Sequence, residues 1–474
     1  MLTSLIKIVT RRLGWKSKTN PTFVVKPYLQ LGDSSDSLSL VWFSAYKKKL
    51  WSAQVRSGAN CEWINVEIRA GKDKTLKVDK FVTREFIIDL PLFIDNPTHL
   101  TELRQPEYQI SLAQDLVFSS TYRIPQTIED SKVIVFGDFG DGSFAASAIA
   151  AAVYKRKPEL IVLPGDLVYD HGRVSEYLRF FFPVLNADAI HKDLGAPIMR
   201  SIVTVPAAGN HDVGMPKQID NLDAASFSDL FGYFLFWQVP NNGPHLKKET
   251  IRAMIGTKKK TNQLLRNYGK SFFRKTNFSF NWKDQHWVIL DANNYADWTL
   301  PELRDWLVKD LESASSKKWK FVVFHQPGFN SDNKYCNDQR MRIICPILEA
   351  GAVDVVFSGH CHFYQRHRPL FFRPEEDKPR EDGKVPGEFV IDYQFDGVEN
   401  TLPNGVIYIV TGASGKLVNS DIKENVETSI GSSAVLIDDQ HSFTELSFAD
   451  NHLLMSQVSL SGEVLDSVRI DKSS

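Results

Sequence analysis

The sequence lacks the features that mark several large classes of protein. It has only four cysteines in 474 residues, too few for a fold built on disulfide bonds. No apolar run approaches the ~20 residues that a transmembrane helix needs. The 56 lysines and arginines are balanced by 57 aspartates and glutamates, so the chain has no basic surplus of the kind that binds nucleic acid. What remains is an ordinary globular composition, 43% hydrophobic and 24% charged, with length enough for more than one domain.

The cysteines and the N-terminal segment give information about where in the cell the protein is found. Cys336 and Cys345 are close enough in sequence to pair, but we favour free thiols in a reducing compartment. Residues 1–20 carry five basic side chains and no acid, and Lys7 interrupts their apolar stretch. No small-residue cleavage site follows, so no secretory signal is expected. We expect a cytoplasmic protein, although an organelle transit peptide, a basic helix in contact with a membrane surface and a solvated leader are all compatible with this segment.

The segment 21–126 has a β pattern. Stretches such as "SLSLVWFS" and "REFIIDL" are rich in β formers, and turn signals such as "GDSSDS" separate them. Short strands at this spacing predict a small sandwich, with "FSSTYRIPQ" as the exit into a linker.

From 127 to 474 the pattern changes to apolar runs with helical stretches between several of them. Such runs predict an α/β layered sheet buried on both faces. The long polar stretch 213–276 is either an insertion over the functional site or a solvated excursion, and 440–474 predicts an antiparallel β finish. The six runs are "KVIVFGDFG", "ELIVLPGDLVYD", "IVTVPAAGNHD", "HWVILDANN", "KWKFVVFHQP" and "AVDVVFSGHCH".

Polar residues follow the apolar runs at the ends where open α/β sheets build their sites. One aspartate there is often a helix cap, and one histidine is more often structural than a ligand. Carboxylate, amide and imidazole groups after five such runs instead indicate a site for metals such as iron, zinc or manganese. The candidates are Asp138, Asp166, Tyr169, Asn210, His211, Asp212, His325, His360 and His362.

This set is large enough for two ions. A pair of ions ~3.5–4 Å apart needs a bridging carboxylate, and Asp166, in the middle of the series, is the natural bridge. His360 and His362 are spaced by two, so in a strand they would face the same way and serve one ion each, with Cys361 pointing away.

These blocks resemble the calcineurin-like metallophosphoesterase superfamily, whose pattern GD…GD…GNH[DE]…H…GHxH is matched in order between Val133 and Gln365. The resemblance implies a four-layer α/β/β/α sandwich and a metal-dependent phosphoric ester hydrolase. An interaction protein on an inactive phosphatase fold would be marked by lost ligands, and none is missing here.

Within that superfamily the chain is similar to purple acid phosphatases. Tyr169 stands three residues after Asp166, where those enzymes have a tyrosine that binds ferric iron, although it could instead pack under the site. "GHCHFYQR" resembles their GHxHxYER block, with Gln365 in place of Glu. "VKPYLQLG" and the strands after it resemble a fibronectin-III-like domain at 21–126. Asp212 and Phe329 depart from the family's usual Glu and Tyr.

The resemblance also implies roles. An Fe(III) ion would be paired with Fe(II), Zn(II) or Mn(II), and metal-bound hydroxide would attack a small phosphate monoester in line, with a phosphodiesterase or nucleotide pyrophosphatase as the alternative. His211 would act as general acid or transition-state donor, Asn210 and His211 would bind the substrate, and His171 is a further candidate contact. One ion would take Asp138, Tyr169, His362 and the bridging Asp166; the other would take Asn210, His325, His360 and the same bridge.

Overall fold

The computed structural model describes residues 22–32, 38–46, 48–70, 76–78, 81–90, 105–124, 131–213, 232–255, 262, 272–417 and 431–472. The basic leader at 1–20 lies outside the described residues, and so does much of the expected insertion at 213–276. No helix in the described part of the chain has the length and apolarity to cross a membrane.

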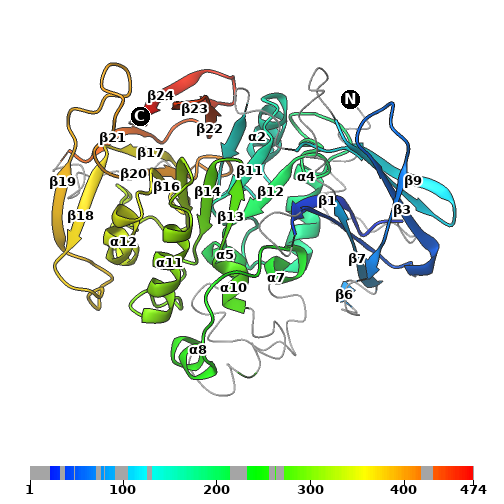
Figure 1. Cartoon of the computed structure of the whole chain (residues 1–474), viewed down its shortest axis with the longest axis horizontal. Coiled ribbons are helices and arrows are strands. Elements are labelled where there is room, and N and C mark those ends of the chain that lie inside the picture. Colours follow the sequence, from blue (N-terminus) through cyan, green and yellow to red (C-terminus); the bar gives the residue numbers. More distant parts are fainter. Residues whose placement is uncertain are drawn as a thin grey trace.

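The N-terminal region is built from two antiparallel sheets (Figure 1). Trp42, Trp51 and Phe86 pack against one another between them, with ring centroids 5.5–5.7 Å apart. The predicted strands are present, but Phe118–Thr121, expected as the exit into a linker, belong to the last strand of the second sheet. The first sheet consists of β1 (Val25–Leu31), β2 (Leu38–Ser44), β7 (Phe81–Leu90), β5 (Arg69–Ala70) and β6 (Leu76–Val78), and the second of β4 (Ile64–Val66), β3 (Trp51–Arg56), β8 (Glu107–Leu112) and β9 (Asp115–Thr121).

A six-stranded mixed sheet begins the second half of the fold. The first three of its strands along the chain are short, buried except for the half-buried Lys132, and parallel to one another. The C-terminal strands return to pair antiparallel beside the first of these. The order is β12 (Val203–Pro206), β11 (Leu160–Leu163), β10 (Lys132–Val135), β22 (Ser442–Phe448), β23 (His452–Ser459) and β24 (Val464–Asp471).

A seven-stranded sheet faces it. Its four central strands, β14, β15, β16 and β20, run parallel. The order is β13 (Phe278–Trp282), β14 (Gln285–Ile289), β15 (Trp319–Val323), β16 (Val355–Ser358), β20 (Ile407–Thr411), β17 (Tyr364–His367) and β21 (Ser433–Ile437), with a ribbon of β18 (Leu370–Pro374) and β19 (Gly387–Ile391) beside it.

Helices cover the outer faces of both sheets (Figure 1). Leu303, Leu307 and Leu311 recur every fourth residue along one helix, so they form one apolar stripe that packs on Val322 and Val356 of the seven-stranded sheet. The inner faces of the two sheets share a second core, so the order of layers is helix, sheet, sheet, helix. The helices include α2 (Phe144–Lys155), α4 (Phe182–Leu185), α7 (Gly232–Phe236), α8 (Lys248–Ile255), α10 (Phe272–Thr276), α11 (Pro301–Ser313), α12 (Cys345–Ala350) and the 3-10 helix η5 (Arg340–Ile344).

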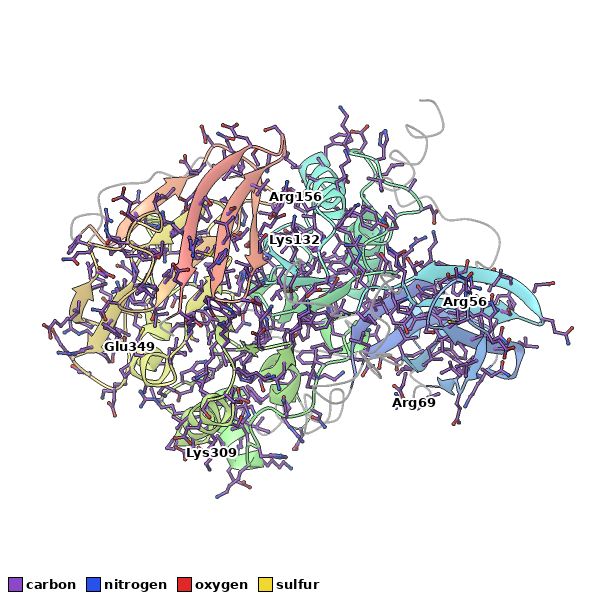
Figure 2. All side chains as sticks on the ribbon, turned by 45° about the horizontal axis from the view of Figure 1, so that its top comes forward. Arg56, Arg69, Lys132, Arg156, Lys309 and Glu349 are labelled. Carbon is purple, nitrogen blue, oxygen red and sulfur yellow. The ribbon has the colours of Figure 1, made fainter. Side chains whose placement is uncertain are left out.

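Charges tie the first helix to the sheet beneath it. The side chain of Ser143 caps α2 by accepting the N–H of Ala146 at 3.1 Å. At the other end of α2, Arg156 donates twice to Glu445 of β22, at 2.6 and 2.7 Å, and Lys132 of β10 lies 3.6 Å from the same carboxylate. Arg156 and Lys132 lie near each other in Figure 2. This network fixes the C-terminal strands against β10, from whose end the site begins.

Candidate metal centre

Five loops meet at one end of the two central sheets. They follow β10, β11 and β12 of one sheet and β15 and β16 of the other, at the carboxyl ends of parallel strands. Three of their residues have left-handed backbones that turn the chain sharply after the strand: Asp138 (φ 58°), Asp166 (φ 49°) and His360 (φ 69°). The adjoining Gly359 allows close approach, because a Cβ there would lie 2.4 Å from Asp138 Oδ2. Strand order thus gathers residues from five distant parts of the chain.

One group of candidate ligands surrounds Asp138. The phenol of Tyr169 donates to Asp138 Oδ1 at 3.2 Å and lies 3.2 Å from His362 Nε2. His362 Nε2 is 3.6 Å from the same carboxylate oxygen. The backbone N–H of His360 donates to both oxygens of Asp138, at 3.1 and 2.9 Å, which fixes this carboxylate in place. Oxygen from a carboxylate, oxygen from a phenol and nitrogen from an imidazole therefore converge.

A second group surrounds His325. Its Nε2 lies 3.1 Å from Asn210 Oδ1, 3.3 Å from Asp166 Oδ1 and 3.3 Å from His360 Nδ1. Asp166, His325 and His360 form a set whose candidate ligand atoms all lie within 4.8 Å of one another. The groups adjoin, since His325 Nε2 is 4.0 Å from Asp138 Oδ1.

The protonation pattern of the second group fits a cation. His325 Nδ1 lies 2.8 Å from the carbonyl oxygen of Pro164, to which it must donate, so when the ring is neutral the lone pair of Nε2 is directed into the cluster. Asp166 and Asn210 also present oxygens there. More lone pairs than protons face this point, and a metal ion that accepts N and O donors would satisfy them. The residues present therefore fit a metal centre.

Burial sets the charges of the centre in the absence of metal. It raises the pKa of Asp138 well above its usual range, an effect that nearby Asp166 reinforces. Burial also acts to raise the pKa of Asp166, but the charge and hydrogen bond of His325, together with the nearby His211 and His360, lower that pKa below the usual range. Burial acts to lower the pKa of His325, yet Asp166 and Asp138 together raise it to about 9. The pKa of His360 is shifted in the opposite direction, because burial and its neighbour His325 hold it well below the usual range.

His211 lies at the rim of the centre, on the short helix α5 (Asn210–Val213). Its backbone N–H donates to Asp166 Oδ1 at 2.9 Å, and its Nδ1 lies 2.9 Å from the carbonyl oxygen of Asp170. Nε2 then faces the centre, 3.9 Å from Asp166 Oδ2. The ring packs on Tyr169 at 4.5 Å between centroids, and the side chain is 21% exposed. His211 can therefore reach both the centre and solvent.

His171 is held in the same loop by its backbone, whose N–H donates to Glu176 Oε2 at 3.1 Å. Its contact with substrate stays a prediction.

The block "GHCHFYQR" behaves differently from a strand. Residues 359–363 are irregular, and β17 begins only at Tyr364. The strand alternation from which we predicted the orientations of His360 and His362 is therefore wrong as their explanation. The left-handed backbone of His360 orients the two rings instead. Cys361 does point away, into a small buried cluster with Phe363 and Val410. All four cysteines are free, as predicted.

The last two residues of this block are structural. Gln365, in place of the usual Glu, is buried and accepts the N–H of Ser331 at 3.0 Å while donating to the hydroxyls of Ser331 and Ser433 at 2.6 and 2.9 Å. Arg366 forms a two-point ion pair with Asp466, at 2.6 and 3.0 Å. Because these contacts hold both side chains, neither serves as a ligand of the metal centre.

Asp212, a candidate for the metal site by sequence, supports the ligand loops instead, and Asn293 has a supporting role that was not predicted. Asp212 accepts the N–H groups of Gly209 and Leu167, at 2.9 and 3.0 Å, and so ties two ligand loops together. Asn293, after β14, donates to the carbonyl oxygen of Ala208 and accepts from Gln326, both at 3.2 Å. The run "LDANN" was recognised as a strand end, but nothing in it marked an amide that braces two other loops.

The ring of Tyr335 was also missed. It packs on His360 with centroids 4.1 Å apart, and its hydroxyl accepts from Lys334 Nζ at 2.6 Å. No sequence signal marks this contact, because the loop that carries it has no periodic pattern.

Comparison with known proteins agrees with this geometry. Residues 131–364 match the model of the calcineurin-like phosphoesterase family. A segment of 97 residues is 34% identical to purple acid phosphatase 18 of Arabidopsis thaliana, covering 19% of this chain and 21% of that protein. Another of 83 residues is 35% identical to a purple acid phosphatase of Glycine max, covering 17% of this chain and 18% of that one. The chain thus spans about a fifth of the length of the curated relatives that it matches.

Two solved structures share the fold. The purple acid phosphatase PPD1 from yellow lupin (Lupinus luteus) seeds aligns with a TM-score of 0.64 and 16% identity over 96% of this chain and 75% of that chain. PhoD aligns with a TM-score of 0.53 and 10% identity over 96% and 94%. The fold and the site define a metallophosphoesterase domain.

More specifically, residues 131–364 form a domain of the calcineurin-like phosphoesterase family, similar to purple acid phosphatases, as the five blocks predicted. The predicted mixed α/β fold is confirmed, and the N-terminal sheets are consistent with a β-sandwich. A fibronectin-III-like topology and the domain limits stay predictions.

Proposed function

We propose that this protein hydrolyses phosphate monoesters at a dinuclear metal centre. The observation that carries the proposal is the convergence of seven N and O donors from five loops into two adjoining groups. Bound ions would neutralise phosphate charge and lower the pKa of a water molecule that serves as nucleophile. The protein would hold them through Asp138, Tyr169 and His362 on one side and Asn210, His325 and His360 on the other, with Asp166 between.

His211 is the proposed general acid. Because Nδ1–H is fixed on the carbonyl oxygen of Asp170, proton exchange takes place at Nε2, the nitrogen that faces the centre. A proton donor at hydrogen-bonding distance from the leaving oxygen typically contributes 10²–10⁴-fold to the rate. Its partial exposure lets it regain the proton from solvent after each turnover.

Tyr169 supports iron on the Asp138 side. Its phenol is part of the first group, and burial together with Asp138 raises its pKa well above the usual range when no cation is present. A strongly charged cation such as Fe(III) would be needed to hold the phenolate. The second ion is proposed as Fe(II), Zn(II) or Mn(II).

The test compares p-nitrophenyl phosphate with bis(p-nitrophenyl) phosphate as substrates of the purified full chain, with metal content and the visible spectrum recorded on the same sample. We expect preference for the monoester, two metals per chain and a visible band that is lost in Tyr169→Phe. His211→Asn should lower kcat by about 100-fold or more with both metals retained.

Preference for the diester would replace the monoester assignment with a phosphodiesterase. A colourless active enzyme without iron would contradict the ferric site, and a metal-loaded protein that hydrolyses neither substrate would overturn the proposal.

A further inference from the structure

The ring of Tyr335 covers one face of the candidate ligand His360. The two ring centroids lie 4.1 Å apart, with 53° between the ring planes. On its other side His360 faces the second group of ligands, because its Nδ1 lies 3.3 Å from Nε2 of His325. Within the part of the chain that the structure describes, His360 packs on two rings, and only that of Tyr335 comes from outside the candidate ligands.

His360 and His325 differ in what orients their rings. A histidine that binds a metal usually donates its other ring N–H to an acceptor, and this hydrogen bond fixes the orientation of the ring. His325 has such an acceptor, the carbonyl oxygen of Pro164 at 2.8 Å from Nδ1. Among the described residues, no acceptor meets Nε2 of His360, whose hydrogen bonds are made by its backbone N–H and Nδ1. The packing of Tyr335 therefore takes the place of that hydrogen bond.

Tyr335 is itself held in a defined position. Its hydroxyl accepts from Lys334 Nζ at 2.6 Å, and the same ammonium group lies 4.6 Å from the centroid of the ring. Its backbone N–H donates to the carbonyl oxygen of Asp332 at 3.2 Å, and the Asp332 carboxylate accepts the N–H of Lys334 at 2.8 Å. These contacts fix both the backbone and the ring of Tyr335 before any metal is bound.

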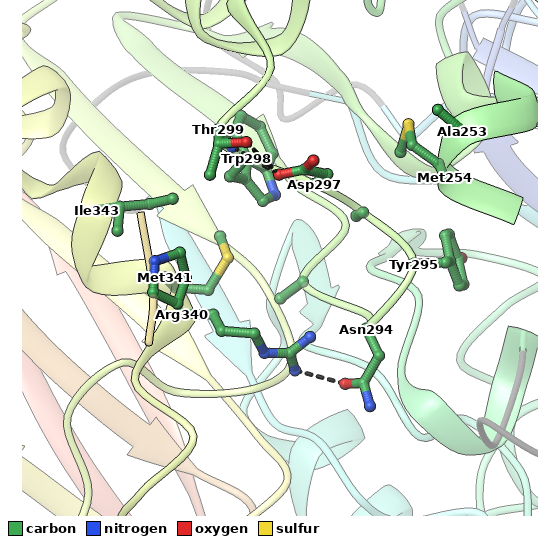
Figure 3. A pocket seen from close by; sticks show the side chains of 13 residues that line it. Ala253, Met254, Asn294, Tyr295, Asp297, Trp298, Thr299, Arg340, Met341 and Ile343 are labelled. Carbon is green, nitrogen blue, oxygen red and sulfur yellow. Dashed lines mark hydrogen bonds between the residues drawn. The ribbon is translucent and has the colours of Figure 1, made fainter. Parts of the chain in front are cut away.

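The loop that carries Tyr335 is anchored to the rest of the fold at its far end. The buried side chain of Gln339 accepts the N–H of Val385 at 3.0 Å. The next residue, Arg340, donates to Asn294 Oδ1, and Figure 3 shows this contact at the wall of a cavity of about 290 Å³ that both residues line. The fold, rather than a ligand, therefore sets where Tyr335 lies.

We propose that Tyr335 is a positioning residue for the metal centre, which acts by holding the ring of His360 so that Nδ1 faces the second group of ligands. The inference deepens the proposed function and rests on it for the ion that this group would hold. It gives the ring of Tyr335 a role in metal affinity and no contact with the substrate. Loss of a residue that orients a metal ligand typically costs about 10–100-fold in metal affinity.

The first experiment titrates Zn(II) into the metal-free full chain against a competing chelator. We expect Tyr335→Ala to weaken one of two Zn(II) dissociation constants by about tenfold or more and to leave the other unchanged. Tyr335→Phe keeps the ring and should bind both ions as wild type does. Tyr393→Ala is the matched control, because Tyr393 is 60% exposed and its ring lies beside Arg368, at 5.7 Å.

The second experiment separates positioning from a general loss of structure and from substrate binding. Metal-free Tyr335→Ala should unfold close to the Tm of metal-free wild type, because the tyrosine is half-buried in a loop. At saturating Zn(II), its KM for p-nitrophenyl phosphate should equal that of wild type. A raised KM with unchanged Zn(II) affinity would assign Tyr335 to the substrate and overturn the inference.

Three results of the zinc titration would also overturn it: no change in Tyr335→Ala, an equal loss at both sites, or a loss in Tyr335→Phe as large as in Tyr335→Ala. The last result would show that the hydroxyl acts and the ring does not. If wild type binds a single Zn(II), the dinuclear centre of the proposed function fails, and the affinity for that ion in the two Tyr335 variants still decides this inference.

Discussion

At the scale of single residues, we expect the proton on His325 to control how readily the centre takes up a metal. The buried carboxylates Asp166 and Asp138 overcome burial and raise the pKa of His325 to about 9. Metal binding needs the lone pair of Nε2, so a proton must leave. His360 adds no such competition, because burial and His325 keep its pKa low and its ring neutral.

We therefore predict that metal affinity of the metal-free protein rises with pH up to about 9, by up to about tenfold per pH unit from this proton. The folding stability of the metal-free protein depends on pH in the opposite direction. The stability that charged His325 contributes is complete below about pH 6.5 and is lost as the pH rises through about 9. Titrations against a competing chelator at pH 6, 7, 8 and 9 measure the slope. His325→Asn should reduce it by about one, and an unchanged slope would contradict the assignment.

At the scale of elements, one ion pair joins the two central sheets. Arg366 of β17 and Asp466 of β24 are each 9% exposed, and Tyr364 also donates to Asp466 at 2.7 Å. Removing one partner of a buried pair leaves an uncompensated charge, which typically costs about 3–5 kcal/mol, whereas replacing both can be nearly neutral. The pair therefore specifies how the last strand docks more than it adds to net stability.

We predict that Asp466→Ala lowers the free energy of unfolding by about 3–5 kcal/mol and that Arg366→Met with Asp466→Leu recovers most of it. Denaturant unfolding followed by fluorescence and circular dichroism checks both. Arg373→Ala is the control, because Arg373 pairs with Glu388 on the surface, where each side chain is about 70% exposed, and should change stability little. A double variant no more stable than Asp466→Ala would refute the pairing argument.

The elements also show what sequence could predict. The six apolar runs correspond to β10, β11, β12, β14, β15 and β16. They could be predicted because a strand buried on both faces must be apolar along its whole length, and the chain must turn after it. The candidate ligands could be predicted because they lie in the turns directly after five of these strands. The sequence did not indicate that β22 would pair with β10, or that Asn293 and Tyr335 would contact the ligand loops. These contacts join segments that are distant in sequence, and the local pattern of one segment does not show which other segment it will meet.

At the scale of the whole molecule, the N-terminal sheets and the metallophosphoesterase domain share one interior. Tyr28 donates its hydroxyl to the carbonyl oxygen of Phe236 at 2.7 Å, and Gln30 bonds both that carbonyl, at 3.0 Å, and the N–H of Gln238, at 2.7 Å. Rings cross the same boundary, with Tyr28 5.1 Å from Phe182 and Phe43 5.3 Å from Phe236. Buried residues on both sides belong to one continuous apolar cluster.

Because the boundary is apolar and carries buried hydrogen bonds, neither part can leave the other without exposing large rings. We predict that the full chain unfolds in a single calorimetric transition and that a chain starting at residue 127 is insoluble or binds a hydrophobic dye. Gln30→Ala would leave buried groups without partners, at roughly 1–3 kcal/mol each, so it should lower Tm and keep the single transition. Gln54→Ala, which removes a side chain that hydrogen-bonds Asn65 within the second sheet, is the control and should shift Tm less. Two resolved transitions, with the metals retained through the first, would show that the N-terminal sheets form an independent domain and that the shared interior does not couple them to the site.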